Sequence, residues 1–258
     1  TILAWLSYYE RYGNGVYLQA ATRLGRWIES NCRDTRGSGG YTAGFRGWEP
    51  EPTPLSYKST EHNIDVYVAF SRLYQYTRKD IWREGAIAAA EFVLSMWDPQ
   101  AGKFWTGTTS DGETTNKNVI PLDIHGWSLL AFTEKEFSQT QQVLDYLETH
   151  HQTDGGFDFN PDGDGVWYEG TAHMALAYRI LGKRRQAQQL LAFLKANQDE
   201  SGGMFASNRE SGITTGFFLP DGSPWLYFRR LHVGTTAWYI LAEKGVKPFW
   251  MTKNPGSL

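Results

Sequence analysis

The chain alternates two kinds of predicted helix, and this alternation most constrains its fold. Helices that are apolar on nearly every side are predicted at residues 2–12, 60–76, 121–133, 168–181 and 232–243. Helices with one charged face are predicted at residues 16–30, 80–97, 137–150 and 183–197. A helix that is apolar all round must be buried, whereas a helix with a polar stripe lies at the surface. The chain is therefore expected to wind between inner and outer helices.

The connections between these helices differ in length according to their direction. Inner-to-outer connections are short, as at Gly13-Asn14-Gly15 and Leu181-Gly182-Lys183. Outer-to-inner connections are long and rich in Gly, Asp and aromatic residues. Short and long connections should therefore lie at opposite ends of the helices. Because long ordered loops are usually functional, we expect the functional site at the long-loop end.

Composition narrows the class of protein. The chain has 258 residues and 41% hydrophobic content, which suffices for one large core, so we expect a single domain over residues 1–258. A net charge of -3 argues against a nucleic-acid groove, which needs a basic stripe. No apolar run approaches the roughly 20 residues of a membrane span, and one cysteine, Cys32, cannot form an internal disulfide. Aromatic residues are plentiful at 15%, and in polar loops they are candidate binding platforms.

A related turn follows each outer helix. The four turns contain Gly39-Gly40-Tyr41, Gly102-Lys103-Phe104, Gly155-Gly156-Phe157 and Gly202-Gly203-Met204. Glycine supplies the positive φ that a tight turn after a helix needs. The following aromatic residue or methionine is then expected to enter the core. A repeat that is loose in length but consistent in order favours a ring of helical hairpins over a regular solenoid.

Alternating inner and outer helices, joined by Gly-Gly-aromatic turns and long loops on one face, resemble the (α/α)6 toroid superfamily. Its branches are the six-hairpin glycosidases, the related polysaccharide lyases and sugar epimerases, and the terpenoid cyclase and prenyltransferase toroids. The resemblance covers most of the chain and implies an all-α toroid that acts on carbohydrate. The terpenoid branch is disfavoured because no Asp-rich DDxxD or DxDD motif is present.

The start of the chain also bears on this resemblance. A full toroid of this superfamily has about twelve helices, whereas the sequence predicts nine, and Thr1 leads straight into an apolar helix. We therefore expect a toroid that is incomplete at the N-terminus. An upstream fragment or a second copy of the chain would complete it.

The inner helices begin with conspicuous polar residues. Their first turns contain Glu61, His62 and Asp65, then Asp123, His125 and Trp127, then Trp167, Tyr168 and Glu169, and finally Arg229 and His232 before the last helix. Acids in a first turn also stabilise helices simply as caps. Three acids converging on one funnel, beside histidines and aromatic rings, are harder to explain by capping alone. We therefore expect Glu61, Asp123, Glu169 and His232 to line one concave site.

Glycoside hydrolysis requires one protonated and one ionised carboxyl group. Glu61 and Glu169 are the leading pair, with Asp123 as the third candidate, and inversion is favoured because these acids start different inner helices. The remaining predicted site residues would bind the sugar. These are His62, Asp65, His125, Trp127, Trp167, Tyr168, Tyr227, Arg229 and His232.

Two alternatives to hydrolysis stay open. The resemblance to toroid lyases implies proton abstraction by a tyrosine and a histidine or asparagine, and binding of a uronate through Arg229 or Arg230. The candidates for proton abstraction are His62, Asn63, His125, Tyr168 and His232. A toroid that binds carbohydrate without catalysis would make little use of the acids. No cofactor is expected for any of these functions.

The segment Asn160-Pro161-Asp162-Gly163-Asp164-Gly165 matches positions 1, 3, 5 and 6 of a calcium loop. Its twelfth position is Thr171 rather than Glu, so the motif is incomplete. A turn is the favoured interpretation, and a metal site at Asn160, Asp162 and Asp164 is the weaker alternative.

Overall fold

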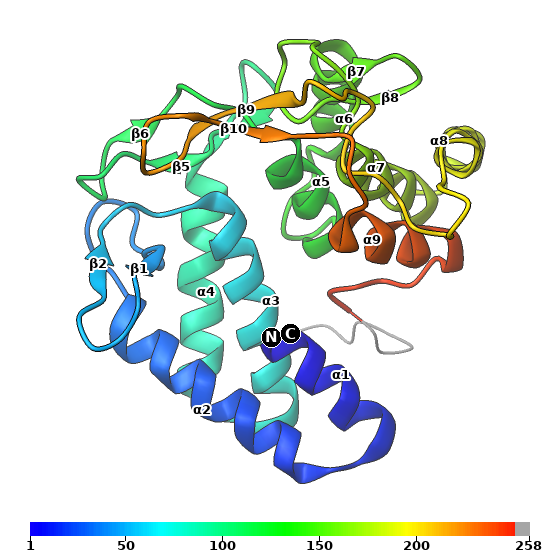
Figure 1. Ribbon diagram of the computed structural model, residues 1–258. Helices are drawn as coiled ribbons and strands as arrows, with labels where there is room; N and C mark the ends of the chain where they lie inside the picture. Colours follow the sequence, from blue (N-terminus) through cyan, green and yellow to red (C-terminus); the bar gives the residue numbers. More distant parts are fainter. Residues whose placement is uncertain (251–258) are drawn as a thin grey trace. The chain divides into compact units, whose positions relative to one another are not determined.

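A computed structural model describes residues 1–250 of the chain. Helices dominate it, and each helix predicted from the sequence is present (Figure 1). The helices are α1 (Ile2–Tyr12), α2 (Gly15–Cys32), α3 (Thr60–Thr77), α4 (Asp80–Ser95), α5 (Leu122–Ala131), α6 (Thr140–His150), α7 (Tyr168–Ile180), α8 (Arg184–Ala196) and α9 (Val233–Lys244). The all-α prediction is confirmed. Within the described residues, every helix is too short or too polar to cross a bilayer.

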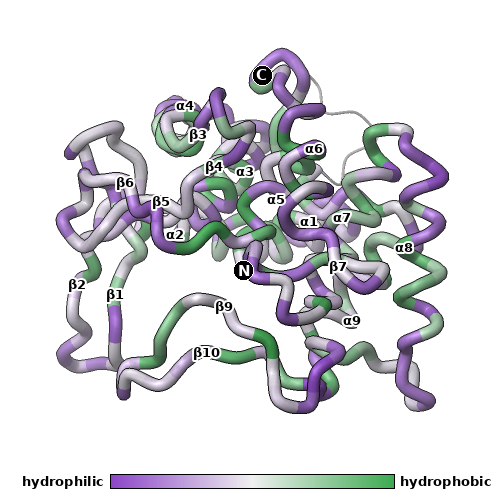
Figure 2. The backbone as a smooth tube through the Cα atoms, turned by 90° about the horizontal axis from the view of Figure 1, so that it is seen from above, coloured by the Kyte–Doolittle hydropathy of each residue, from purple (hydrophilic) through white to green (hydrophobic). Residues whose placement is uncertain are grey.

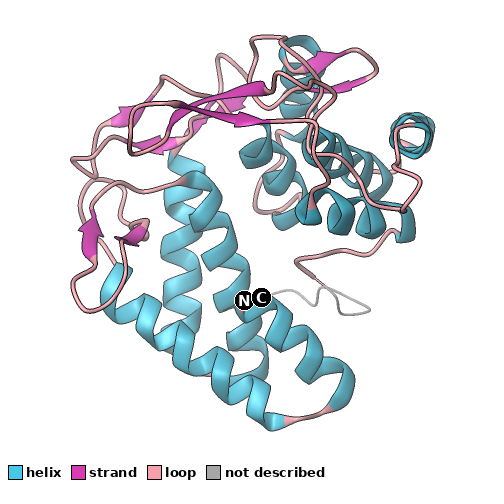
Figure 3. Ribbon diagram, in the orientation of Figure 1, coloured by secondary structure: helices cyan, strands magenta, loops and turns pink. Residues whose placement is uncertain are grey.

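The long connections contain short strands that pair locally into two-stranded sheets (Figure 3). The strands are β1 (Gly44–Arg46), β2 (Thr53–Leu55), β3 (Trp97–Asp98), β4 (Lys103–Phe104), β5 (Gly107–Thr108), β6 (Thr115–Asn116), β7 (Gln152–Thr153), β8 (Gly156–Phe157), β9 (Ile213–Phe218) and β10 (Pro224–Tyr227). The longest pair, β9 and β10, is an antiparallel hairpin in the connection between α8 and α9. This hairpin was not predicted from the sequence.

The chain divides into two compact units. The N-terminal unit contains residues 1–97, 105–116 and the described part of the terminal segment from Phe249, and it holds α1 to α4. The C-terminal unit contains residues 98–104 and 117–248, and it holds α5 to α9. The expectation of one domain over the whole chain stays a prediction.

In the N-terminal unit, α1 packs on α2, α3 packs on α4, and the two inner helices α1 and α3 are neighbours. Small residues let α3 and α4 approach closely. A Cβ on Gly85 of α4 would lie 2.6 Å from the Phe70 ring of α3, and Trp82 is fully buried against the same ring. The close contact explains why the outer helix carries glycine and alanine on its inner face.

In the C-terminal unit, α7 is the central helix and packs against α5, α8 and α9. Every residue from Gly170 to Tyr178 is buried, which confirms the prediction that an inner helix is enclosed on all sides. The outer helix α8 behaves differently, since hydrophilic and hydrophobic colours alternate along it in Figure 2. Only Ala187, Leu190 and Leu194 of α8 are buried.

Helices α1 and α9 depart from the predicted burial of inner helices. In α1, Tyr8 and Tyr12 are 43% and 61% exposed, and in α9, Val233 and Ile240 are 86% and 49% exposed. Within its own unit each of these helices packs against one inner helix, α3 or α7 respectively. A helix that is apolar all round but packs against one inner helix within its unit keeps part of its apolar surface exposed.

The four predicted turns share one anchoring arrangement. Tyr41, Phe104, Phe157 and Met204 are all fully buried, as the sequence predicts. The backbone N–H of each donates a hydrogen bond to an inner-helix side chain, four residues after that helix's N-cap. The acceptors are Asn63 Oδ1 at 2.8 Å, His125 Nε2 at 3.1 Å, Thr171 Oγ1 at 3.0 Å and Thr236 Oγ1 at 3.0 Å. The repeated sequence turn is therefore a repeated structural joint between a long loop and an inner helix.

Candidate active site

Glu169 lies in the first turn of α7, where free backbone N–H groups favour a carboxylate. Its side chain is 15% exposed and faces two histidines. The Oε2 atom lies 3.4 Å from Nδ1 of His232, and Oε1 lies 4.0 Å from Nε2 of His173. Glu169 and His232, two of the four residues predicted to share a site, therefore do lie together.

Aromatic rings pack around the two histidines that face this carboxyl group. His173 sits 4.2 Å from the Trp238 ring, 5.5 Å from Trp167 and 5.8 Å from Trp127, measured between ring centroids. Tyr227 of β10 stacks on Trp167 at 5.6 Å and lies 5.9 Å from His232. The rings come from α5, α7 and its N-cap, β10, and α9 with its N-cap, so several elements of the C-terminal unit form one aromatic wall.

His232 has two roles in this geometry. It is the N-cap of α9, and its Nδ1 accepts a hydrogen bond from the backbone N–H of Thr235 at 3.2 Å. Partial burial lowers its pKa, which favours the neutral ring. With Nδ1 already accepting, the 3.4 Å contact with Glu169 Oε2 brings two acceptors together. A protonated Glu169 could donate to Nδ1 only in place of the Thr235 N–H, because the ring nitrogen has a single lone pair.

His173 serves as an uncharged neighbour. Burial lowers its pKa to about 3, so the ring is neutral at pH 7. Its Nε2 accepts a hydrogen bond from the Trp127 indole N–H at 3.4 Å. The 4.0 Å approach to Glu169 is therefore no ion pair.

Gly234 makes room for the Glu169 carboxyl group. A Cβ at this position would lie 2.9 Å from Oε2 and 3.0 Å from Oε1 of Glu169. The first turn of α9 can therefore approach the carboxyl group only because the residue has no side chain.

Asp123 occupies the first turn of α5 and is 8% exposed. It lies one helical turn before Trp127, as Glu169 lies one turn before His173. Because Trp127 contacts His173 and residues four apart share a helix face, the two acids lie at the same end of neighbouring helices. The membership of Asp123 in the site of Glu169 stays a prediction.

Two predicted sugar-binding residues are buried and hydrogen-bonded to other parts of the fold, and their role in binding a sugar stays a prediction. His125 is fully buried, with Nε2 accepting from Phe104 N–H and Nδ1 bonded to the Pro121 carbonyl at 3.0 Å. Burial lowers its pKa to about 3, so it is a neutral anchor of the turn. Tyr168 is 3% exposed, and its hydroxyl donates to Asn197 Oδ1 at 3.1 Å, on the side of α7 that faces α8.

Trp167 and Arg229 are placed differently from the expectation. Trp167 is 2% exposed and packs between Phe159 and Tyr227, so it supports the wall of the site from behind. Arg229 pairs with Glu210 at 3.2 Å and lies over the Phe205 ring at the surface. Its role in binding a sugar stays a prediction.

Glu61, His62 and Asp65 belong to the N-terminal unit, at the start of α3. This helix start is held firmly: Ser59 Oγ accepts from His62 N–H, and Thr60 Oγ1 donates to the Trp105 carbonyl at 2.7 Å. Burial raises the pKa of Glu61. The pairing of Glu61 with Glu169, which lie in different units, stays a prediction.

Asp65 lines a cavity of about 190 Å³ in the N-terminal unit, together with apolar residues of α1, α2 and α3. Burial, and then the charge of Glu61, raise its pKa from 3.8 to about 6, against the opposing effect of His62. Asp65 and Glu61 are four residues apart on one helix face, so ionising both is unfavourable.

This shift gives a stability prediction for Asp65→Asn. A carboxyl group whose pKa is raised in the folded state makes the protein less stable as pH rises toward that pKa. The reason is that ionising the group costs more free energy in the folded protein than in the unfolded chain. The variant should therefore unfold at a higher temperature than the wild type at pH 8. At pH 4 the difference should shrink, since the wild-type side chain is then protonated when folded. Thermal denaturation at both pH values measures this, and an equal or lower Tm at pH 8 would contradict it.

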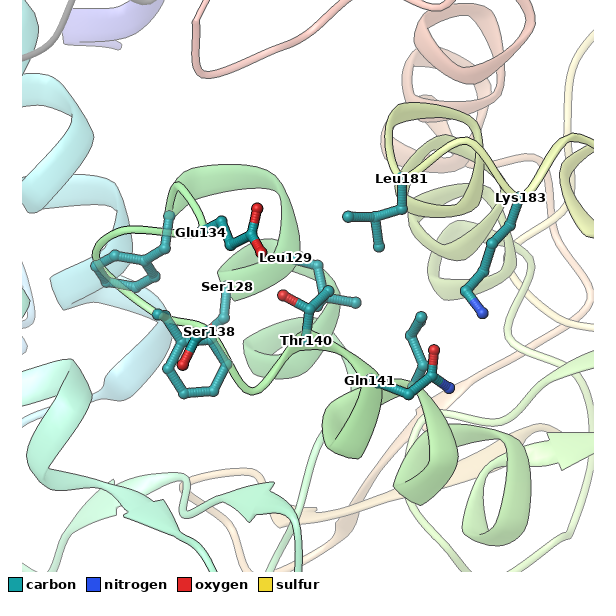
Figure 4. A pocket seen from close by; sticks show the side chains of 11 residues that line it. Ser128, Leu129, Glu134, Ser138, Thr140, Gln141, Leu181 and Lys183 are labelled. Atoms are coloured by element: carbon teal, nitrogen blue, oxygen red, sulfur yellow. The ribbon is translucent and has the colours of Figure 1, made fainter.

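A larger cavity in the C-terminal unit is unrelated to this site. It has a volume of about 360 Å³ and is lined by the end of α5, the start of α6 and the turn after α7 (Figure 4). Leu129 and Leu181 are among its lining residues, whereas Asp123 and Glu169 start the same helices. The cavity therefore lies at the short-connection end, away from the acids.

Comparison with known proteins establishes the fold. No protein-family model matches the chain, and no curated protein matches it by sequence. A cellobiose 2-epimerase from Spirochaeta thermophila is similar in structure, with a TM-score of 0.65 at 18% identity over 96% of this chain and 68% of that one. A family 76 glycoside hydrolase from a bovine Bacteroides thetaiotaomicron strain gives 0.63 at 14%, over 94% of this chain and 54% of that one. A glycosyl hydrolase of family 88 from Bacteroides vulgatus gives 0.63 at 12%, over 96% and 73%.

These structures are (α/α)6 toroids of the six-hairpin glycosidase kind, so the predicted toroid fold is confirmed, whereas its incompleteness at the N-terminus stays a prediction. The chain spans just over half the length of the family 76 structure and about two thirds of the epimerase.

Three residues of the site were not predicted from the sequence. His173 and Gly234 lie beside the Glu169 carboxyl group, and Trp238 packs on the His173 ring. His173 had a usable signal, since it follows Glu169 by four residues on the same helix face. Gly234 and Trp238 had none, because only the packing of α9 on α7 brings them near.

Proposed function

We propose that this chain is a carbohydrate-active enzyme, and that it hydrolyses a glycosidic bond with Glu169 as general acid. The proposal rests on the contact of Glu169 with His232 beside an aromatic wall. A general acid must hold a proton at working pH, and Glu169 has an ionisable partner, His232, within 3.4 Å with which it can exchange one. Aromatic side chains such as Trp127 and Tyr227 are suited to stack on sugar rings.

The second carboxyl group comes from Glu61 or Asp123. Hydrolysis needs an ionised carboxylate opposite the acid, to activate water or to attack the anomeric carbon. Both candidates start inner helices, as Glu169 does. We further propose inversion, in which the two carboxyl groups are roughly 6.5–9.5 Å apart and leave room for water.

A panel of oligo- and polysaccharides tests this proposal. The expected result is release of shorter sugars, and NMR of the first product formed should show the opposite anomer to the substrate. Retention of the anomer would contradict the inverting mechanism but would still support hydrolysis. Tight sugar binding without any turnover over the whole panel would favour a non-catalytic binding protein.

A second candidate function is proton abstraction from the sugar, as in an epimerase or a lyase. His232 favours it, because a ring whose pKa is lowered and whose side chain is 36% exposed can act as a base beside Glu169. One structural neighbour is described as a cellobiose 2-epimerase. In ordinary water an epimerase would give a product with the mass of the substrate, and in D2O that product would contain deuterium. A lyase would give an unsaturated product that absorbs ultraviolet light.

Gly234→Ala tests the position of Glu169 without removing it. The new Cβ must displace the carboxyl group, since it would otherwise lie 2.9 Å from Oε2. A displacement of about 1 Å in a catalytic group costs up to 10²-fold in rate, so we expect turnover to fall roughly ten- to a hundredfold. Alanine is the better helix former by about 0.5–1 kcal/mol, so Tm should not fall by more than a few degrees. Unchanged turnover would count against a catalytic Glu169.

A further inference from the structure

Three aspartates of the loop between β8 and α7 point their carboxyl groups at one another. Asp158, Asp162 and Asp164 each bring an oxygen to within 4.8 Å of the other two. Asp158 is fully buried, Asp164 is half-buried and Asp162 is exposed. All three belong to the C-terminal unit.

One oxygen of Asp158 and one of Asp164 are buried without a hydrogen-bond partner among the described residues. These atoms are Asp158 Oδ2 and Asp164 Oδ1. The other oxygen of each is used: Asp158 Oδ1 accepts from Phe159 N–H at 2.7 Å, and Asp164 Oδ2 accepts from Thr214 N–H at 2.7 Å. Leaving buried carboxylate oxygens unsatisfied is costly. Each of these two residues therefore presents one oxygen that the protein itself does not satisfy.

No basic side chain of the described residues donates a hydrogen bond to these two oxygens. Arg209 contacts this loop, but its guanidinium donates hydrogen bonds to Asp154 Oδ2 at 3.1 Å and to the Asp164 backbone carbonyl at 3.0 Å. His151 contacts the Asp158 carbonyl through Nδ1, and burial lowers its pKa to about 4, so it is neutral. Burial and the charges of Asp164 and Asp162 raise the pKa of Asp158 to about 7. The charge of Arg209 acts to lower the pKa of Asp164, but within the described residues no cation bonds the two unsatisfied oxygens directly.

We propose that Asp158, Asp162 and Asp164 bind a calcium ion. Carboxylate oxygens are the ligands that this ion prefers, at 2.3–2.6 Å, so a span of up to 4.8 Å between ligand oxygens fits around one ion. Water molecules complete the six to eight ligands that calcium takes.

The geometry corrects the calcium loop suggested by the sequence. Asn160 Oδ1 accepts from Asp162 N–H at 3.2 Å, and its amide donates to the Thr214 carbonyl at 3.3 Å, so its side chain is engaged elsewhere. Thr171 anchors the Phe157 turn. Asp158 takes the place that the motif assigned to Asn160.

The ion would fix the loop that leads into the active site. Asp162 and Asp164 already hold Thr214 of β9 through its hydroxyl at 2.5 Å and its N–H. The loop then runs directly to Trp167 and Glu169. Calcium therefore ties three elements together: the end of β8, the start of β9 and the approach to α7.

Calorimetry and thermal unfolding of the whole chain test the proposal, without reference to activity. After treatment with EDTA, titration with CaCl2 should show one site per chain. Calcium at about a hundredfold excess over its Kd should raise Tm by roughly 5–10 °C. Failure here would leave the proposed glycosidase untouched, since neither measurement uses a sugar.

Asp158→Asn provides the decisive comparison. It should abolish the calcium-dependent rise, yet its Tm without calcium should equal or exceed that of the wild type, because repulsion among the acids is relieved. Asp221→Asn is the matched control, an exposed aspartate in the β9–β10 turn that accepts from Ser223 N–H, and it should keep the full response. A wild-type Tm that does not change with calcium would overturn the proposal. The alternative is then that Asp158 is protonated in the folded protein. A response that survives in Asp158→Asn, or that magnesium alone produces, would overturn it equally.

Discussion

Glu169→Gln is expected to lower kcat by 10²–10⁴-fold while the folded structure is unchanged. Glutamine keeps the shape of the side chain and most of its hydrogen bonding, but it cannot donate an acid proton. General acid–base assistance is typically worth that factor. The side chain is 15% exposed and its neighbours are mostly rings, so the amide fits the same space. Steady-state kinetics on the substrate identified by the panel measures the effect.

The effect must be separated from the loss of a helix-terminal charge. Asp80→Asn provides the control, because Asp80 also lies in the first turn of a helix, α4, but pairs with Arg83 at the surface. An acid in that position stabilises a helix by about 0.3–1 kcal/mol. The control should therefore lose a little stability and keep its turnover. Glu169→Gln should keep its stability and lose its turnover. A Glu169→Gln enzyme with a normal rate would move the assignment to Asp123 or to a histidine base.

Much of the fold follows from the sequence because burial leaves a simple pattern. The nine helices of residues 1–250 appear where apolar faces and charged faces alternate, with ends that shift by a few residues. The largest shift is at α6, predicted from residue 137 but starting at Thr140. Thr133 and Glu136 explain it, since the Thr133 N–H and hydroxyl both donate to Glu136 Oε2 and close a separate turn before the helix.

The repeated turn shows where sequence reasoning reaches its limit. Gly-Gly followed by an aromatic residue predicts the buried ring correctly, as at Gly40-Tyr41. The partner of that turn differs between repeats, being Asn63, His125, Thr171 or Thr236. Nothing in the residue type marks these as equivalent, and so His125 was assigned to the sugar site. Their common place, four residues after the N-cap, becomes visible only once the helix starts are known.

Asp158 was missed for a different reason. It stands between Phe157 and Phe159, so the sequence resembles a buried strand with one polar residue facing out. In the structure it is fully buried. A charge in an apolar run is ambiguous from sequence, because burial cost depends on partners that lie far away along the chain.

Glu61→Gln is the second substitution with a large expected effect. If Glu61 supplies the ionised carboxylate, its amide cannot activate water or attack carbon, and kcat should again fall by 10²–10⁴-fold. If Asp123 supplies it instead, Glu61→Gln should leave the rate within a few fold of the wild type, and Asp123→Asn should abolish turnover. The two variants, measured on one substrate, therefore decide between the two carboxyl groups.

Asp65 makes the Glu61 experiment more discriminating. Glu61 and Asp65 lie one turn apart, and the charge of Glu61 contributes to raising the pKa of Asp65 to about 6. Removing the Glu61 charge should therefore lower the pKa of Asp65 and stabilise the protein at pH 8, even as activity is lost. A purely structural Glu61 also predicts the gain in Tm, but it predicts a normal rate. The combination of a higher Tm at pH 8 with a collapsed kcat is the outcome that only a catalytic Glu61 produces, and a normal kcat would assign the acid to the fold alone.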